Sequence, residues 1–254
     1  MQLNYKKQGK GPDLVILHGF LGSLDNWQTQ ARKLEDEYTV WTLDLRNHGR
    51  SPHSDDHTYQ IMATDLSAFC DEHELGKFHL LGHSMGAKVA MYFADQHPEC
   101  LDKLMLVDMG VKEYKGGHEE ILDALNNLPV NEITSRQEAE THMSKSIRDW
   151  SIRQFLLKNL ARKPGNEYAW RFNLSALTNA YANILEAFKP SEPYEGNTFF
   201  IRGGKSPYLA DGDWDDILQA FPNASLATIP KAGHWVHAEA TDLFLKEVRQ
   251  FLDN

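Results

Sequence analysis

The pentapeptide Gly82-His83-Ser84-Met85-Gly86 has the pattern G-x-S-x-G. Between a strand and a helix, this pattern makes a sharp turn, the nucleophile elbow, that presents the serine hydroxyl for attack. Side chains two residues on either side of the serine would collide in so tight a turn, so both positions favour glycine. We therefore predict that Ser84 is a nucleophile and that Gly82 and Gly86 permit its turn. The alternative is an ordinary strand–helix turn with an incidental serine.

A serine nucleophile needs a general base, and a histidine late in the chain is the best candidate. His234 follows the apolar run Ser225–Ile229 and precedes the last helical pattern, in the order serine, acid, histidine. His237 competes with it, but His237 is expected at a helix start, whereas Gly233 gives His234 a freely shaped loop. His83 is predicted to pack or to line a pocket, because sequence neighbours at an elbow point in different directions.

The acid that would orient the histidine has two possible origins. The usual place is the loop after the run Thr198–Ile201, but this loop has no carboxylate before Asp211 and Asp213, and Ser206 stands where an aspartate is expected. Asp108, directly after an earlier apolar run, would reach the same histidine and hold its tautomer. We favour Asp108 and keep Asp211 or Asp213 as the alternative. A backbone-capping role is the other explanation of Asp108.

Acyl transfer also needs donors for the negative oxygen that forms in the transition state. The tripeptide His18-Gly19-Phe20 directly follows the apolar run Leu14–Leu17, and an H-G-x loop at this place supplies a backbone N–H. We predict that the N–H groups of Phe20 and Met85 form the oxyanion hole. His18 is predicted to shape the loop through local hydrogen bonds and to carry no proton.

The elements that must position these residues are visible as periodic patterns. Apolar runs typical of strands buried on both faces lie at Asp13–Leu17, Tyr38–Leu43, Phe78–Leu81, Lys103–Val107, Thr198–Ile201 and Ser225–Ile229. Residues Gln2–Lys7 are predicted to add an N-terminal edge strand. Helical stripes of apolar residues lie at Met62–Cys70, Val89–Gln96 and Phe244–Leu252. This alternation predicts an α/β fold with a mostly parallel central sheet flanked by helices.

The alternation stops between residues 111 and 193, where we expect helices and no strand. So long a segment is not a simple loop, and we predict a helical cap inserted between two late strands. The core would then comprise residues 1–110 and 194–254, so that the 254 residues form one α/β domain with its cap. Four aromatic residues are interpreted mainly as the core of the cap, with one or two facing the site: Trp150, Phe155, Trp170 and Phe172.

The composition limits the classes of partner. A net charge of −10 argues against nucleic acid, because binding phosphates needs a basic face. No uncharged apolar run approaches the ~18 residues of a membrane span, and residues 1–7 lack the apolar segment of a signal peptide. We therefore expect a cytoplasmic protein with a small-molecule substrate, no nucleic-acid partner and no membrane span.

Cysteine and histidine usage bears on redox and metal chemistry. Cys70 and Cys100 could form one disulfide, but without an export signal we favour two reduced thiols. The chain has 12 histidines, and the stretch His53–His57 looks like a metal cluster. It lacks the i, i+4 spacing of a helical zinc motif, so we favour a solvated loop. We predict no metal and no cofactor.

The chain resembles the α/β-hydrolase superfamily over nearly its whole length, and within it the small YbfF-type esterases. The resemblance is carried by Leu17–Ser23, Asn26-Trp27, Asp44–His53, Gly203–Tyr208 and Gly233–Glu239. At Asn47 other members of the superfamily more often have glycine. In the YbfF-type group the acid comes from the earlier strand end, which supports Asp108. The resemblance implies hydrolysis of carboxylic esters or thioesters of short to medium acyl chains, without a cofactor.

The same scaffold carries other activities, because membership in a superfamily does not determine the reaction. Dehalogenases and epoxide hydrolases use an aspartate nucleophile, so Ser84 argues against both. A C–C hydrolase or lyase remains an alternative. A small-molecule receptor with residual hydrolase activity is the alternative in which the main function is binding.

Overall fold

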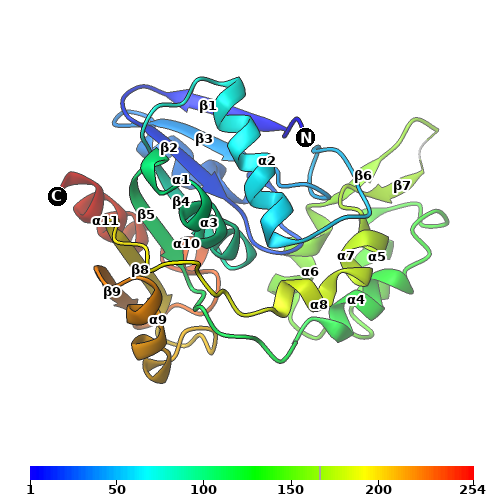
Figure 1. The fold of residues 1–254 in the computed structure, drawn as a ribbon. Helices are drawn as coiled ribbons and strands as arrows, with labels where there is room; N and C mark the ends of the chain where they lie inside the picture. The colour runs from blue at the N-terminus through cyan, green and yellow to red at the C-terminus, as the bar shows by residue number, and fades with distance from the viewer. Residues whose placement is uncertain (166) are drawn as a thin grey trace.

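The computed structural model describes residues 1–165 and 167–254 and is built around a seven-stranded sheet (Figure 1). The strand order is β1-β3-β2-β4-β5-β8-β9; β1 pairs antiparallel with β3, and the other pairs are parallel. The strands are β1 (Tyr5–Gly9), β2 (Asp13–Leu17), β3 (Thr39–Leu43), β4 (Phe78–His83), β5 (Leu101–Val107), β8 (Thr198–Gly203) and β9 (Ala224–Ile229). The mostly parallel sheet and its edge strand are confirmed.

Helices cover both faces of the sheet, which explains why its inner strands are mostly buried apolar runs, whereas the edge strand β1 is polar and exposed. Leu14 and Ile16 of β2 belong to one buried cluster with α1 and α11, whereas Val15 and Leu17 belong to the opposite cluster with α2 and α3. The helices of the core are α1 (Gln28–Leu34), α2 (Tyr59–Glu72), α3 (Met85–Gln96), α9 (Trp214–Ala220), α10 (Val236–Glu239) and α11 (Thr241–Asp253). Short 3₁₀ helices are formed by Leu24–Trp27, Pro98–Cys100 and Asp211–Asp213.

The predicted helical stripes match the observed helices. The Thr58 side chain accepts a hydrogen bond from the Ile61 N–H and starts α2, as threonine does at a helix N-cap. The apolar stripe of α2 is buried against the sheet, and so is that of α11 through Phe244, Val248 and Leu252. Packing of these stripes on the sheet supplies the helical stability that short helices lack alone.

The residues between β5 and β8, which we call the insertion (residues 111–193), lie beside one end of the sheet (Figure 1). Its elements are α4 (Glu119–Asn126), α5 (Arg136–Met143), α6 (Trp150–Leu157), β6 (Leu160–Arg162), β7 (Tyr168–Trp170), α7 (Leu174–Asn179) and α8 (Tyr181–Leu185). Insertion and core share one continuous buried cluster. The insertion therefore packs directly on the sheet domain.

The prediction that the insertion contains no strand is wrong. β6 and β7 form a small antiparallel hairpin in which Leu160 pairs with Trp170 and Arg162 with Tyr168. The guanidinium of Arg162 lies 5.2 Å from the centre of the Tyr168 ring, a cation–π contact. Strands of three residues are too short to show an alternating pattern, so local sequence does not reveal this hairpin.

Two further predictions concern cysteines and membrane spans. Cys70 is buried and Cys100 half-buried, and both are free thiols, which confirms the preference over a disulfide. Within residues 1–165 and 167–254, none of the helices combines the length and apolar character needed to cross a bilayer.

Candidate active site

Ser84 stands at the sharp turn between β4 and α3, with a φ of 54° and a ψ of −118°. This backbone conformation is strained for a residue with a side chain. A Cβ on Gly82 would collide with the carbonyl oxygen of Gly86, and one on Gly86 would lie 2.6 Å from the carbonyl oxygens of Leu17 and His18. Both glycines are therefore required by the turn, as the G-x-S-x-G pattern indicates.

The sheet register places the ends of β4 and β5 side by side. His83 pairs with Val107, so Ser84 and Asp108, the next residue of each strand, emerge at the same edge. Asp108 is fully buried and also has a positive φ, of 51°. The loop after β9 brings the third predicted residue to this edge, although it lies more than a hundred residues further along the chain.

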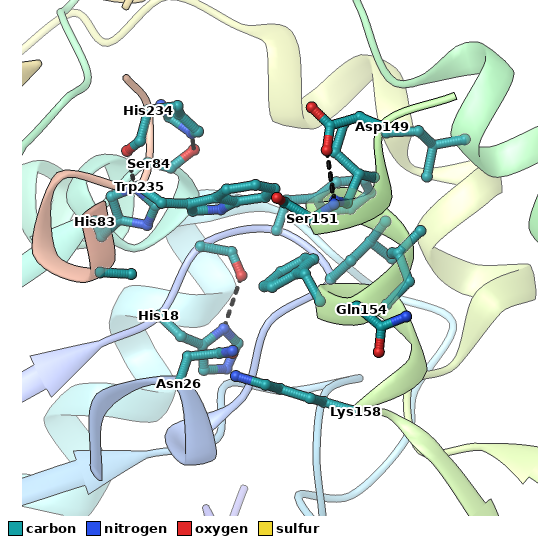
Figure 2. A pocket seen from close by; sticks show the side chains of 18 of the residues that line it. His18, Asn26, His83, Ser84, Asp149, Ser151, Gln154, Lys158, His234 and Trp235 are labelled. Atoms are coloured by element: carbon teal, nitrogen blue, oxygen red, sulfur yellow. Dashed lines mark hydrogen bonds between the residues drawn. The ribbon is translucent and has the colours of Figure 1, made fainter. Parts of the chain in front are cut away.

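A continuous chain of hydrogen bonds joins the three side chains. His234 Nε2 lies 3.0 Å from Ser84 Oγ, and His234 Nδ1 lies 2.7 Å from Asp108 Oδ2 (Figure 2 shows the serine and the histidine). A carboxylate can only accept, so Nδ1 carries the proton and Nε2 is free to accept from the serine hydroxyl. The arrangement can therefore move a proton from Ser84 to His234.

The carboxylate of Asp108 is held by donors that sequence reasoning did not assign. The Gly203 N–H donates to Oδ1 at 2.9 Å, and the Ser206 hydroxyl donates to Oδ2. Ser206 occupies the place where an aspartate was expected, and it binds the carboxylate that replaces that aspartate. Ser206 could be recognised as a partner of Asp108 only if the order of the strands in the sheet were already known.

The alternative acids lie in other interactions. Asp211 pairs with Arg202 at 2.5 Å, and Asp213 pairs with Lys112 at 2.6 Å. Neither makes the contact with His234 that Asp108 makes. Geometry therefore favours Asp108 over both alternatives.

Two other histidines flank His234 without occupying its position. His237 stacks on Trp27 with ring centres 4.1 Å apart, and burial lowers its pKa to about 3. His83 Nε2 donates to the carbonyl oxygen of His234 at 2.9 Å, and burial lowers the pKa of His83 well below its ordinary value. His83 thus supports the loop that presents His234, a role that adds to the predicted packing.

The two predicted oxyanion donors are backbone N–H groups beside the serine. A Cβ on Gly19 would lie 3.2 Å from the Ser84 Cβ, so the loop that carries Phe20 passes close to Ser84. Met85 is the first residue of α3, where an N–H has no partner within the helix. Among the hydrogen bonds of the described residues, none uses the N–H of Phe20 or of Met85. Both groups are free to donate to a ligand.

A cavity of about 500 Å³ opens above Ser84 and His234. Figure 2 shows these two residues and Trp235 on one side, and Ser151 and Gln154 of α6 on the other. Trp150 and Phe155 of α6 also line the cavity, and the Phe155 and Trp235 rings lie 5.3 Å apart. One wall of the cavity therefore belongs to the insertion.

The other two aromatic residues of the insertion do not line this cavity. Trp170 and Phe172 stack on each other with ring centres 5.1 Å apart. Phe172 is buried. Two of the four aromatic residues thus face the cavity, within the expected one or two, but Trp150 is largely exposed and does not belong to the core of the insertion.

The described part of the chain holds no group of three or more histidine, cysteine or acidic side chains arranged for a metal ion. In the loop interpreted as solvated, His53 is exposed and its Nε2 donates to the Arg171 carbonyl oxygen at 3.0 Å. His57 is buried next to Asn47. These contacts place the two histidines in different environments.

The sequence profile of the family described as "alpha/beta hydrolase fold" matches residues 12–241. The chain belongs to the α/β-hydrolase family. Esterase YbfF of Escherichia coli is 34% identical over an alignment of 260 positions that covers 100% of both chains. An sn-1-specific diacylglycerol lipase, ABHD11 of Xenopus laevis, is 37% identical, covering 96% of this chain and 80% of the lipase. A solved structure, a marine microorganism esterase, is 38% identical with a TM-score of 0.97, covering 98% and 99% of the two chains.

The family match, together with full-length relatives named as esterase and lipase, shows that this chain is a hydrolase, and the resemblance to YbfF-type esterases is confirmed. The departure at Asn47 has a structural explanation. Asn47 has a φ of 64°, and asparagine is the non-glycine residue that adopts this region most readily. Its side-chain oxygen accepts from the Ser54 N–H at 2.8 Å and from Asn173 of the insertion at 3.2 Å. The asparagine thus keeps the turn and adds a contact between core and insertion.

Proposed function

We propose that this hydrolase cleaves carboxylic esters or thioesters of short to medium acyl chains through an acyl-enzyme on Ser84. The observation that carries the proposal is the unbroken hydrogen-bond chain from Ser84 through His234 to Asp108 at the base of a cavity. Hydrolase relatives named as esterases or lipases support an ester substrate.

In the first step, Ser84 Oγ forms a bond to the carbonyl carbon while its proton passes to His234 Nε2. The electron pair of the carbonyl bond moves to the oxygen, which the N–H groups of Phe20 and Met85 stabilise. The tetrahedral intermediate then expels the alcohol or thiol, which takes the proton from His234. This leaves the acyl group on the serine.

In the second step, His234 removes a proton from water as the water oxygen attacks the acyl carbon. The negative oxygen of the second tetrahedral intermediate accepts hydrogen bonds from the same two N–H groups. Collapse breaks the bond to Ser84 Oγ, which recovers its proton from His234, and the carboxylic acid leaves. Asp108 stays ionised throughout, holds the tautomer of His234 and stabilises the imidazolium.

The insertion, residues 111–193, is proposed to act as the cap that selects the substrate. Its helix α6 contributes Trp150 and Phe155 to the cavity, opposite the nucleophile. An apolar wall facing the serine suits the binding of an acyl chain. A cavity of about 500 Å³ suits a chain of limited length.

Substitution and labelling of Ser84 test the proposal. Ser84→Ala should lower kcat on p-nitrophenyl butyrate by about 10⁴-fold or more, because the covalent step is lost, with an unchanged circular dichroism spectrum. A fluorophosphonate probe should label Ser84 and nothing else. Activity within tenfold of wild type would show that the elbow serine is not the nucleophile. A folded wild-type protein that is neither labelled nor active on any ester or thioester of an acyl-length series would favour a receptor.

A further inference from the structure

The turn that carries the Phe20 N–H contains an unusual backbone conformation. The Gly22 N–H donates to the Gly19 carbonyl oxygen at 3.0 Å and closes a β-turn with Phe20 and Leu21 at its centre. Leu21 has a φ of 57°, in the left-handed region. A positive φ at this position is typical of a type II turn, where glycine or asparagine normally supplies it. A leucine keeps this conformation only where its surroundings hold it.

Two side chains from distant segments hold Leu21. Its N–H donates to His48 Nε2 at 3.2 Å, and its carbonyl oxygen accepts from Asn159 Nδ2 at 2.9 Å. His48 Nδ1 donates to the Arg46 carbonyl oxygen at 2.9 Å, which leaves Nε2 as the acceptor. Burial lowers the pKa of His48 well below its ordinary value, so the ring stays neutral and keeps that lone pair.

Asn159 comes from the insertion, at the junction between α6 and β6, and is buried. Its partner is a carbonyl oxygen, so the amide must present its NH₂ group to Leu21. Its own side-chain oxygen is buried without a partner among the described residues. Of the two polar groups of this amide, only the NH₂ group makes a hydrogen bond among the described residues.

The direction of the Phe20 N–H depends on this turn. The Gly19 carbonyl oxygen accepts from the Gly22 N–H and from His18 Nδ1 at 2.8 Å. In a planar trans peptide, the N–H of Phe20 points opposite to that carbonyl. The Gly22 N–H is brought to this carbonyl by a turn whose second central residue, Leu21, has a left-handed φ. A change of conformation at Leu21 would therefore move the Gly22 N–H and weaken one of the two contacts that hold the peptide carrying the donor.

We propose that His48 and Asn159 are positioning residues of the oxyanion hole, which hold Leu21 in its left-handed conformation and so keep the Phe20 N–H directed at the substrate carbonyl. The inference rests on the proposed function, in which this N–H binds the oxyanion. Because Asn159 belongs to the insertion, the oxyanion hole is complete only when the insertion is packed on the core.

Asn159→Ala tests this role. Oxyanion contacts strengthen in the transition state, so kcat per active site should fall about tenfold or more while KM changes less than about twofold. The number of active sites is measured by complete fluorophosphonate labelling. A trifluoromethyl ketone inhibitor, which forms an oxyanion when Ser84 adds to it, should lose affinity by the same factor as kcat/KM.

A matched control separates positioning from a general loosening of the insertion. Asn183, also in the insertion, donates to the His57 carbonyl oxygen at 3.1 Å, away from the turn. Asn183→Ala should leave kcat per active site and inhibitor affinity unchanged. At the other partner, His48→Gln keeps an acceptor and should retain more activity than His48→Ala.

Several outcomes would overturn the inference. Wild-type kcat and inhibitor affinity in Asn159→Ala would do so, and so would an equal loss in Asn183→Ala. The Asn159 comparison stands even if His48→Ala does not fold. Ester hydrolysis that survives Ser84→Ala would instead overturn the proposed function, so the two failures are distinguishable.

Discussion

Ser84 and Asp108 both stand on backbone that glycine adopts easily and other residues do not. Their φ values are 54° and 51°, each at a cost on the order of 1–3 kcal/mol. Adjacent strands end at these two residues, and the turn at each end presents its side chain beyond the sheet edge. The Asp108 carboxylate accepts from His234, Gly203 and Ser206, so its buried charge is compensated by three donors.

At the scale of single residues, replacing the acid tests its assignment. In Asp108→Asn, an amide facing His234 favours the wrong tautomer, so kcat should fall by about 10³- to 10⁴-fold. Asp211→Asn removes an exposed ion pair and Asp213→Asn a half-buried one, neither in contact with His234, and both should change kcat less than about twofold. The three variants are compared on one p-nitrophenyl ester. Equal effects, or a larger effect at Asp211 or Asp213, would contradict the assignment of the acid.

At the scale of elements, α3 connects Ser84 to the insertion. Ser84 precedes α3, and one turn later the fully buried Lys88 donates to three backbone carbonyl oxygens. Two belong to Val111 and Lys112, where the insertion begins, and one to Glu186, near its end; the distances are 3.0, 2.9 and 2.8 Å. One side chain thus joins both ends of the insertion to the helix that starts at the serine.

Lys88→Met should keep the volume of the side chain and remove all three donors. Leaving buried carbonyls without partners should lower the free energy of unfolding by about 2–5 kcal/mol, as measured by urea denaturation. Because α6 forms a wall of the cavity, KM should also rise. Lys103→Met is the control, since Lys103 donates to the Phe251 and Leu252 carbonyls of α11, away from the insertion. Equal changes of KM in the two variants would contradict this account of α3.

At the scale of the whole molecule, buried histidines predict a sensitivity of folding stability to acid. Burial lowers the pKa of His57 and of His118 to about 4 and that of His237 to about 3. In the unfolded chain these rings bind protons at their ordinary pKa of about 6.5. The unfolded state therefore binds more protons below this pH, and folding stability falls as the pH drops from about 6.5 toward 3.

His237→Phe should reduce this dependence, because phenylalanine can keep the stacking on Trp27 and cannot take up a proton. Between pH 7 and pH 5, the wild type should lose about 2 kcal/mol more unfolding free energy than the variant. Urea denaturation at both pH values provides the measurement. His142→Gln, at a half-exposed position on α5, provides the comparison for removing a histidine as such. Identical pH dependence of the wild type and His237→Phe would contradict the role of the buried ring.

Much of the fold could be predicted because its signals are local. A strand buried on both faces must be a continuous apolar run, and an elbow must have glycine two residues from its serine, so β4 and Ser84 are both visible in a few consecutive residues. The hairpin of β6 and β7 was missed because three residues show no period. Its strands form through pairing with each other and not through a local preference.

The sequence alone predicted Ser84 as the nucleophile, the loop that carries His234, and the alternation of strands and helices in the core, since each depends on steric rules acting over neighbouring residues. The tertiary structure decided which groups meet: Asp108 with His234, Ser206 with Asp108, and Asn159 of the insertion with Leu21 beside the oxyanion donors. These partners lie about a hundred residues or more apart in sequence. Their contacts depend on the strand order of the sheet and the packing of the insertion, which no short segment encodes.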